Sequence, residues 1–123
     1  MIPKFRVWDK VINQIFVPES IHFDLKGNII GLGTKGTIFG IEDFNLMQST
    51  GLVDVNQEEV FKDDIIYDDH YDEYGIVKFY EGRFVIEWQE NHVEDLFERI
   101  DLLEVVGNIH DHPGLLEGDD KCM

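Results

Sequence analysis

The sequence predicts a mainly β protein, with a β-rich N-terminal lobe over residues 1–50 and a small SH3-like β-barrel lobe with one short helix over residues 51–123. Three observations favour this fold class. Short apolar runs alternate with Gly, Pro and Asn, there is little helical periodicity before residue 93, and the charge balance changes at Asp54. A chain of 123 residues, 43% of them hydrophobic, has enough apolar side chains for a packed core shared by two small lobes.

The N-terminal lobe has the pattern of short strands joined by tight turns. Pro18 separates two of the strands, because proline lacks the N–H that a sheet ladder needs. Lys26, Gly27 and Asn28 form an expected turn, since glycine and asparagine accept positive φ at little cost. The strands are expected at residues 5–8, 12–17, 21–25 and 29–32.

The glycine-rich segment GLGTKGTIFG, residues 31–40, has two interpretations. Clustered glycines let backbone amides approach a phosphate, but the spacing matches neither GxGxxG nor GxxxxGK[ST], and no long helix follows. A flexible hairpin loop between two strands fits the pattern better. We therefore expect a loop here and no phosphate site.

The C-terminal lobe begins after the segment from Leu46 to Gly51, which has the pattern of a strand end followed by a turn. Glu81 and Gly82 separate two β-rich runs and predict a hairpin turn. Residues 93–103 carry apolar side chains at helical spacing and predict one amphipathic helix. A last strand is expected over residues 103–106. The apolar runs, at 60–66, 76–79 and 84–88, predict a meander of four or five strands, which is typical of a small SH3-like barrel.

Five segments in order carry a family resemblance: IPKFRVWDK (2–10), LMQSTGLVD (46–54), EEVFKDDII (58–66), GIVKFYEGRF (75–84) and VVGNIHDHPGLLE (105–117). Together they resemble the YopX family of phage and prophage proteins, which has no assigned biochemical activity. The resemblance implies the same SH3-like C-terminal lobe and an N-terminal β-rich piece that mediates self-association. It therefore implies a homo-oligomer inside a bacterial host cell.

Two positions depart from the family pattern. Asp63 stands where the family has glycine before a strand, and aspartate tolerates positive φ better than most residues, so we expect the turn to persist. Gly114 stands where the family has a helix-forming residue, which argues against a short terminal helix.

The charge is distributed unevenly along the chain. Residues 1–53 contain five acids and five bases, whereas residues 54–123 contain the other 21 acids and five bases, so the net charge of −16 lies entirely in the second part. A phosphate backbone is repelled by such a surface, and direct nucleic-acid binding is not expected. Charge complementarity instead favours a basic protein partner, such as a DNA-binding protein whose groove the carboxylates would occupy in place of phosphates.

The sequence also indicates a compartment. Its apolar runs are too short to span a membrane, and its first residues lack the apolar stretch of a signal peptide. Cys122 is the single cysteine, so no internal disulfide can form. These features predict a cytoplasmic protein without membrane association.

Two groups of residues are candidate metal ligands. Asp68, Asp69, His70, Asp72 and Glu73 crowd six positions, but their order does not match an EF-hand, and a solvated acidic loop between strands is the simpler interpretation. His110 and His112 are one residue apart, and a third ligand would have to come from elsewhere in the fold.

Two functions from different classes fit these patterns. The first is a non-catalytic protein-binding module, which needs no cofactor and has no catalytic residues. The alternative is a metal-dependent enzyme built on the acidic loop 68–73 or on His110 and His112. No GxSxG-type nucleophile elbow is present, and Cys122 has acidic neighbours that disfavour its thiolate. The sequence therefore favours the binding module.

Overall fold

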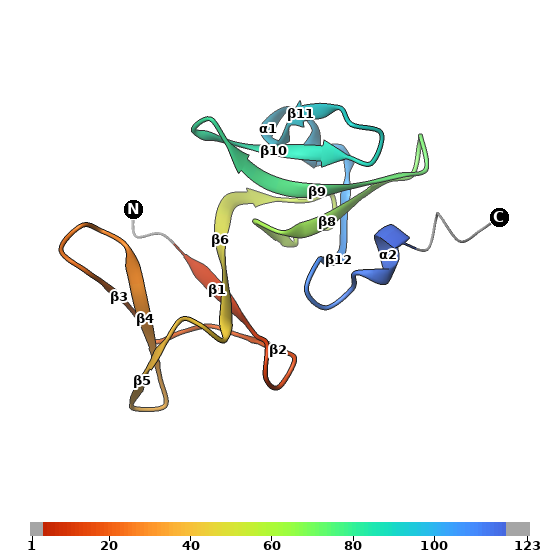
Figure 1. Cartoon of the computed structure of the whole chain (residues 1–123). Coiled ribbons are helices and arrows are strands. Elements are labelled where there is room, and N and C mark those ends of the chain that lie inside the picture. The colour runs from red at the N-terminus through yellow and green to blue at the C-terminus, as the bar shows by residue number, and fades with distance from the viewer. Residues whose placement is uncertain (1–3, 118–123) are drawn as a thin grey trace. The chain divides into compact units, whose positions relative to one another are not determined.

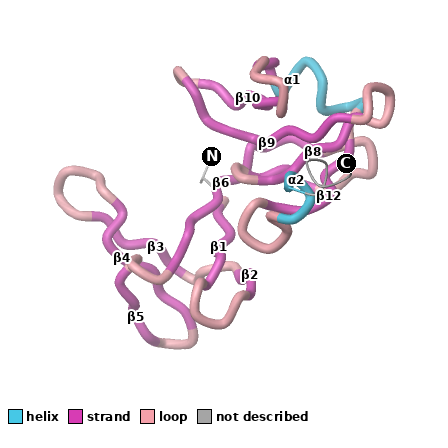
Figure 2. Tube along the Cα trace, turned by 45° about the vertical axis from the view of Figure 1, so that its right-hand side comes forward, coloured by secondary structure: helices cyan, strands magenta, loops and turns pink. Residues whose placement is uncertain are grey.

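The computed structural model describes residues 4–117, and within them the protein is mainly β, as predicted. Figure 1 shows the strands in chain order, and Figure 2 shows that helix is confined to short segments after β10. The chain divides into two compact units, residues 1–48 and 49–123. No helix among the described residues has both the length and the apolar character needed to cross a bilayer. Cys122 lies outside the described residues.

The N-terminal unit contains two small antiparallel sheets. In the first, β2 (Gln14–Phe16) pairs with β1 (Phe5–Asp9), and β1 pairs with the first half of β6 (Phe44–Val53). The second has the order β3 (Ser20–Phe23), β4 (Ile29–Thr34) and β5 (Thr37–Gly40). The fully or nearly buried apolar side chains of the N-terminal unit are Val7, Trp8, Leu32 and Met47.

The glycine-rich segment forms a hairpin between two strands, as expected, but most of it is strand, so the expectation of a loop over the whole segment was wrong. Its residues belong to β4 and β5, which pair from Gly31 with Gly40 to Thr34 with Thr37. Only Lys35 and Gly36 form the connection, with φ values of 53° and 77°. Two successive residues with positive φ make the type of tight turn that matches the right-handed twist of paired strands. The remaining glycines are therefore strand residues.

The turn expected at the end of the segment Leu46–Gly51 is also absent, because β6 continues as a strand to Val53. Gly51 has a φ of 79°, and the pairing of β6 with β7 (Glu59–Phe61) shifts between Ser49 and Val53. A residue with positive φ that interrupts a ladder in this way produces a β-bulge. Glycine thus bends the strand here without ending it.

The C-terminal unit contains a five-stranded antiparallel sheet in the order β11-β10-β9-β8-β12. The strands are β8 (Asp64–Asp68), β9 (Glu73–Tyr80), β10 (Arg83–Trp88), β11 (Val93–Asp95) and β12 (Glu104–Asn108). The predicted hairpin turn between β9 and β10 is confirmed, with φ values of 52° at Glu81 and 82° at Gly82. Closure of this sheet into an SH3-like barrel stays a prediction.

The predicted helix over residues 93–103 is shorter than expected. Val93–Asp95 pairs with β10, α1 covers Leu96–Arg99, and a 3₁₀ turn covers Ile100–Leu102. The Asp95 carboxylate accepts a hydrogen bond from the Phe97 N–H, so the helix begins only after this N-cap. A second helical turn, α2 (Gly114–Glu117), is present although Gly114 argued against it.

The core of the C-terminal unit joins this helical segment to the sheet. Leu96, Ile100 and Leu103 are buried at the spacing of one helical face, whereas Val93 and Phe97 of the same apolar pattern are exposed, so the periodicity was a correct signal only in part. Burial of each large apolar side chain contributes about 1.5–3 kcal/mol. The core cluster consists of Val60, Ile66, Val77, Ile86, Trp88, Leu96, Ile100 and Leu103.

Candidate functional site

The acidic run at residues 68–73 is not one solvated loop. Asp68 ends β8 and is buried, Glu73 begins β9, and only the four residues between them form the exposed turn. Within the turn, Asp72 accepts a hydrogen bond from the Tyr67 hydroxyl at 2.8 Å. This hydrogen bond raises the pKa of Tyr67 to about 12. The carboxylates of the run therefore point to different partners.

Asp68 is engaged by an ion pair that the sequence did not reveal. Its Oδ1 accepts the His70 backbone N–H, and its Oδ2 lies 3.0 Å from Nη2 of Arg99. The other arm of the same guanidinium donates to Oε1 of Glu94. Burial lowers the pKa of Arg99, but the hydrogen bonds and charges of Glu94 and Asp68 outweigh it and raise that pKa overall.

The two candidate histidines have separate protein partners. Nε2 of His110 lies 3.1 Å from Oδ2 of Asp63, while Nδ1 of His112 accepts the backbone N–H of Asn108 at 3.3 Å. In the acidic run, the candidate ligands Asp69, His70 and Asp72 are exposed. Across residues 4–117, no three His, Cys, Asp or Glu side chains lie together as metal ligands.

The geometry instead assembles a polar pocket around Arg99. Trp88 and His92 form an aromatic wall, with ring centroids 6.2 Å apart and planes at 24°. The Trp88 indole N–H donates to Oε1 of Glu94 at 2.7 Å, which fixes the carboxylate that also holds Arg99. The pocket has a volume of about 350 Å³ and is lined by Asp68, Tyr71, Glu73, Trp88, His92, Glu94 and Arg99.

The electrostatics of this Arg99 pocket favour a cation. Three carboxylates line it against one guanidinium. Oε2 of Glu73 is buried and has no hydrogen-bond partner among the described residues. A buried oxygen without a partner is costly, and a donor from a bound group would satisfy it. Sequence spacing alone could not identify this pocket, because its residues come from four strands, two turns and α1.

The described acidic residues of the C-terminal unit differ in burial. Asp54, Asp63, Asp64 and Asp68 are buried and contribute to the interior of the fold. Glu59, Glu73, Glu94 and Asp95 are half-buried. The acids whose side chains are exposed within the described part of the unit are Glu58, Asp69, Asp72, Glu81, Glu87, Glu90, Glu98, Asp101, Glu104 and Asp111.

The fold and the sequence are similar to those of known proteins. A solved structure of protein EF1440 from Enterococcus faecalis is 27% identical, with a TM-score of 0.71, and the match covers 94% of this chain and 99% of that one. Protein yopX from Bacillus subtilis shares the fold at 19% identity and a TM-score of 0.61, over 91% of this chain and 96% of that one. No curated protein matches.

The family comparison covers all of the described residues. The YopX protein family matches residues 4–117, which include both units and all twelve described strands. The resemblance carried by the five sequence segments is thereby confirmed. The chain belongs to the YopX protein family.

Proposed function

We propose that this YopX-family chain is a non-catalytic protein-binding module whose C-terminal unit engages a basic partner protein. The observation that carries the proposal is the Arg99 pocket, where three carboxylates and an aromatic wall surround one guanidinium. The pocket lies in the unit that holds 21 of the chain's 26 acidic residues. A lysine or arginine side chain of the partner complements both features.

The contacts of the pocket suggest how such a side chain binds. The buried Oε2 of Glu73 accepts one hydrogen bond from the incoming cation, and a charged donor makes this bond stronger than a neutral one. Tyr71 is 65% exposed at the pocket, so its ring is available for a cation–π contact. The exposed carboxylates around the unit raise the rate at which a basic protein approaches.

The N-terminal unit has a different role in this proposal. Its sequence up to residue 53 has no net charge, so two copies of it do not repel each other electrostatically. It also exposes large apolar side chains such as Val11, Val17 and Ile38. Apolar surface of this kind is typical of protein contacts, and we propose that the unit forms the homo-oligomer. The cytoplasm of a bacterial cell that carries the phage or prophage is the proposed setting.

The test uses a fluorescent nine-residue arginine peptide and the full-length protein, with anisotropy as the readout. We expect binding that weakens as NaCl rises, because exposed charges are screened by salt. Glu73→Gln should weaken binding by a factor of about five, since a moderately exposed ion pair is worth up to about 1 kcal/mol.

The matched control is Glu87→Gln. It removes the same charge from an exposed glutamate of β10 that pairs with Lys78 outside the pocket. This variant should bind the peptide nearly as tightly as the unmodified protein. Equal losses in both variants would show that the pocket is not the site, and tighter binding to duplex DNA than to the peptide would contradict the preference for a basic protein.

A further inference from the structure

A second cavity lies in the N-terminal unit, between its two sheets. The strand pairing places Gln14, Asp9 and Phe44 in one row on a face of the first sheet, and Val7 lies in the next row of that face. The pairing of β4 with β5 places Thr34 opposite Thr37, with Leu32 opposite Phe39 in the next row. Val7 and Leu32 are fully buried, so side chains fill the space around these two residues. The cavity lies next to them.

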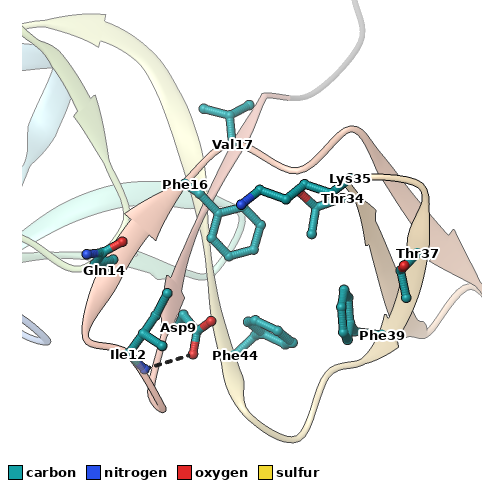
Figure 3. Close-up of a pocket in the computed structure, with 10 residues that line it drawn as sticks. All are labelled: Asp9, Ile12, Gln14, Phe16, Val17, Thr34, Lys35, Thr37, Phe39 and Phe44. Atoms are coloured by element: carbon teal, nitrogen blue, oxygen red, sulfur yellow. Dashed lines mark hydrogen bonds between the residues drawn. The ribbon is translucent and has the colours of Figure 1, made fainter.

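Three phenylalanine rings form the walls of this opening, the aromatic cup of Phe16, Phe39 and Phe44. Phe16 and Phe44 have ring centroids 5.8 Å apart at 78°, and Phe39 and Phe44 have centroids 6.2 Å apart at 62°. Figure 3 shows the rings arranged around one space. The volume of about 500 Å³ is within the range of small-molecule sites, and an apolar wall with few polar groups is typical of them.

The cup contains one positive and one negative side chain. Oδ1 of Asp9 already accepts the backbone N–H groups of Val11 and Ile12, at 2.8 and 3.3 Å, so this oxygen is occupied by the turn after β1 although the carboxylate keeps its negative charge. Lys35 is at the tip of the β4–β5 turn and extends toward Phe16 (Figure 3). Within residues 4–117, no hydrogen bond or ion pair engages its amino group. The free charged donor at the rim is therefore the Lys35 ammonium group.

We propose that the aromatic cup binds a small carboxylic acid with an aromatic or branched aliphatic body. The body fills the space between the three rings, and the carboxylate pairs with Lys35 at the rim. Asp9 lies among the aromatic side chains, where its second carboxylate oxygen repels an anion and accepts a hydrogen bond from a hydroxyl group at the other end of the ligand. This site is in a different unit from the Arg99 pocket and does not depend on the proposed function.

An NMR titration of the ¹⁵N-labelled full chain tests the site with three probes of the same shape: 3-phenylpropionate, its neutral amide and 3-phenylpropylamine. We expect shifts confined to the amides around Asp9, Gln14, Thr34 and Lys35. The carboxylate should bind about fivefold more tightly than the amide, which is the effect of one partly exposed ion pair. The amine should bind most weakly.

Two pairs of variants separate a binding role from a structural one. Lys35→Met keeps the length of the side chain and should lower the affinity for 3-phenylpropionate to that for its amide. Lys26→Met, in the turn before β4, should leave both affinities unchanged. Phe39→Ala should weaken the binding of the acid and of the amide, whereas Phe23→Ala, at an exposed phenylalanine of β3 outside the cup, should not. The spectra themselves show whether each variant is folded.

Several outcomes would overturn the proposal. Shifts outside the cup, equal affinities for acid and amide, or equal effects of Lys35→Met and Lys26→Met would each contradict it. The absence of any shift at 10 mM probe, a concentration chosen to detect binding as weak as about 1 mM, would do the same. A peptide with a C-terminal phenylalanine that binds more than tenfold better than 3-phenylpropionate would reassign the cup to a protein terminus.

Discussion

Removal of the Asp54 carboxylate should destabilise the C-terminal unit more than removal of any exposed acid. Asp54 is 2% exposed. Its Oδ1 accepts the backbone N–H groups of Asn56 and Glu58, each at 2.8 Å, and its Oδ2 accepts that of Val105 at 2.8 Å. One carboxylate thus closes the turn before β7 and attaches that turn to β12.

The size of the effect follows from these three bonds. In Asp54→Ala each of the three N–H groups loses its acceptor, and an unsatisfied buried donor costs about 1–3 kcal/mol. Such losses are not additive within one network, so we expect a decrease of about 3–5 kcal/mol in the free energy of unfolding. That is a large part of the total for a domain of this size, which is typically about 5–15 kcal/mol. Asp54→Asn keeps one oxygen for Asn56 and Glu58 and should have an intermediate effect.

Urea unfolding followed by tryptophan fluorescence measures this free energy, because Trp88 is buried in the same unit. Asp24→Ala is the matched control. Asp24 closes the turn between β3 and β4 in the same way, accepting the N–H groups of Lys26 and Asn28, but these bonds are exposed to water. Water replaces the lost acceptor there, so the control should be far milder. A change below about 1 kcal/mol in Asp54→Ala would refute the assumption that its bonds are shielded from water.

Two further predictions concern the sheet of the C-terminal unit. Tyr67 should ionise later than an ordinary tyrosine, with a pKa of about 12 against 10.0, and Asp72→Asn should bring it back toward 10.0. Because the folded pKa is the higher one, the stabilisation is complete below pH 10 and is lost as the pH rises through about 12; ¹³C NMR of the tyrosine rings measures it. Gly75→Ala should destabilise the fold by about 1–3 kcal/mol, because overpacking a core displaces its side chains. A Cβ at that position would meet Ile86 and approach Cε3 of Trp88 to 2.9 Å, and an unchanged thermal midpoint would contradict this packing.

The turns were the part of the fold that local sequence predicted well. Asp63 has a φ of 74°, as expected for an aspartate that replaces glycine, and Glu81 with Gly82 forms the expected hairpin. Positive φ is a property of one or two residues and leaves a signature in their identity. Gly51 gave the wrong prediction because the same backbone conformation serves a turn and a bulge, and only the pairing with β7 distinguishes them.

The Arg99 pocket was beyond local inference for a related reason. The residues that line it come from separate elements: Asp68 from β8, Tyr71 from the turn after β8, Trp88 from β10, His92 from the turn before β11, and Arg99 from α1. Their proximity depends on strand register, which local periodicity does not encode. The composition did indicate an acidic unit, but it did not separate the carboxylates that bind a guanidinium inside the fold from those that face solvent.

Aspartate and glutamate also differ in the local bonds that they make, although Arg99 pairs with one of each, Asp68 and Glu94. Asp9, Asp24, Asp54, Asp68 and Asp95 each accept the backbone N–H two residues later, the Asx-turn bond that a short side chain makes well. Many tight turns in a small β protein therefore require many aspartates, whatever the protein binds. Of the ten acids that are exposed in the described part of the C-terminal unit, six are glutamates, whose longer side chains are less suited to this bond. The charge available to a partner is accordingly smaller than −16 suggests, and it is the glutamates, with the Arg99 pocket, that a binding experiment has to neutralise.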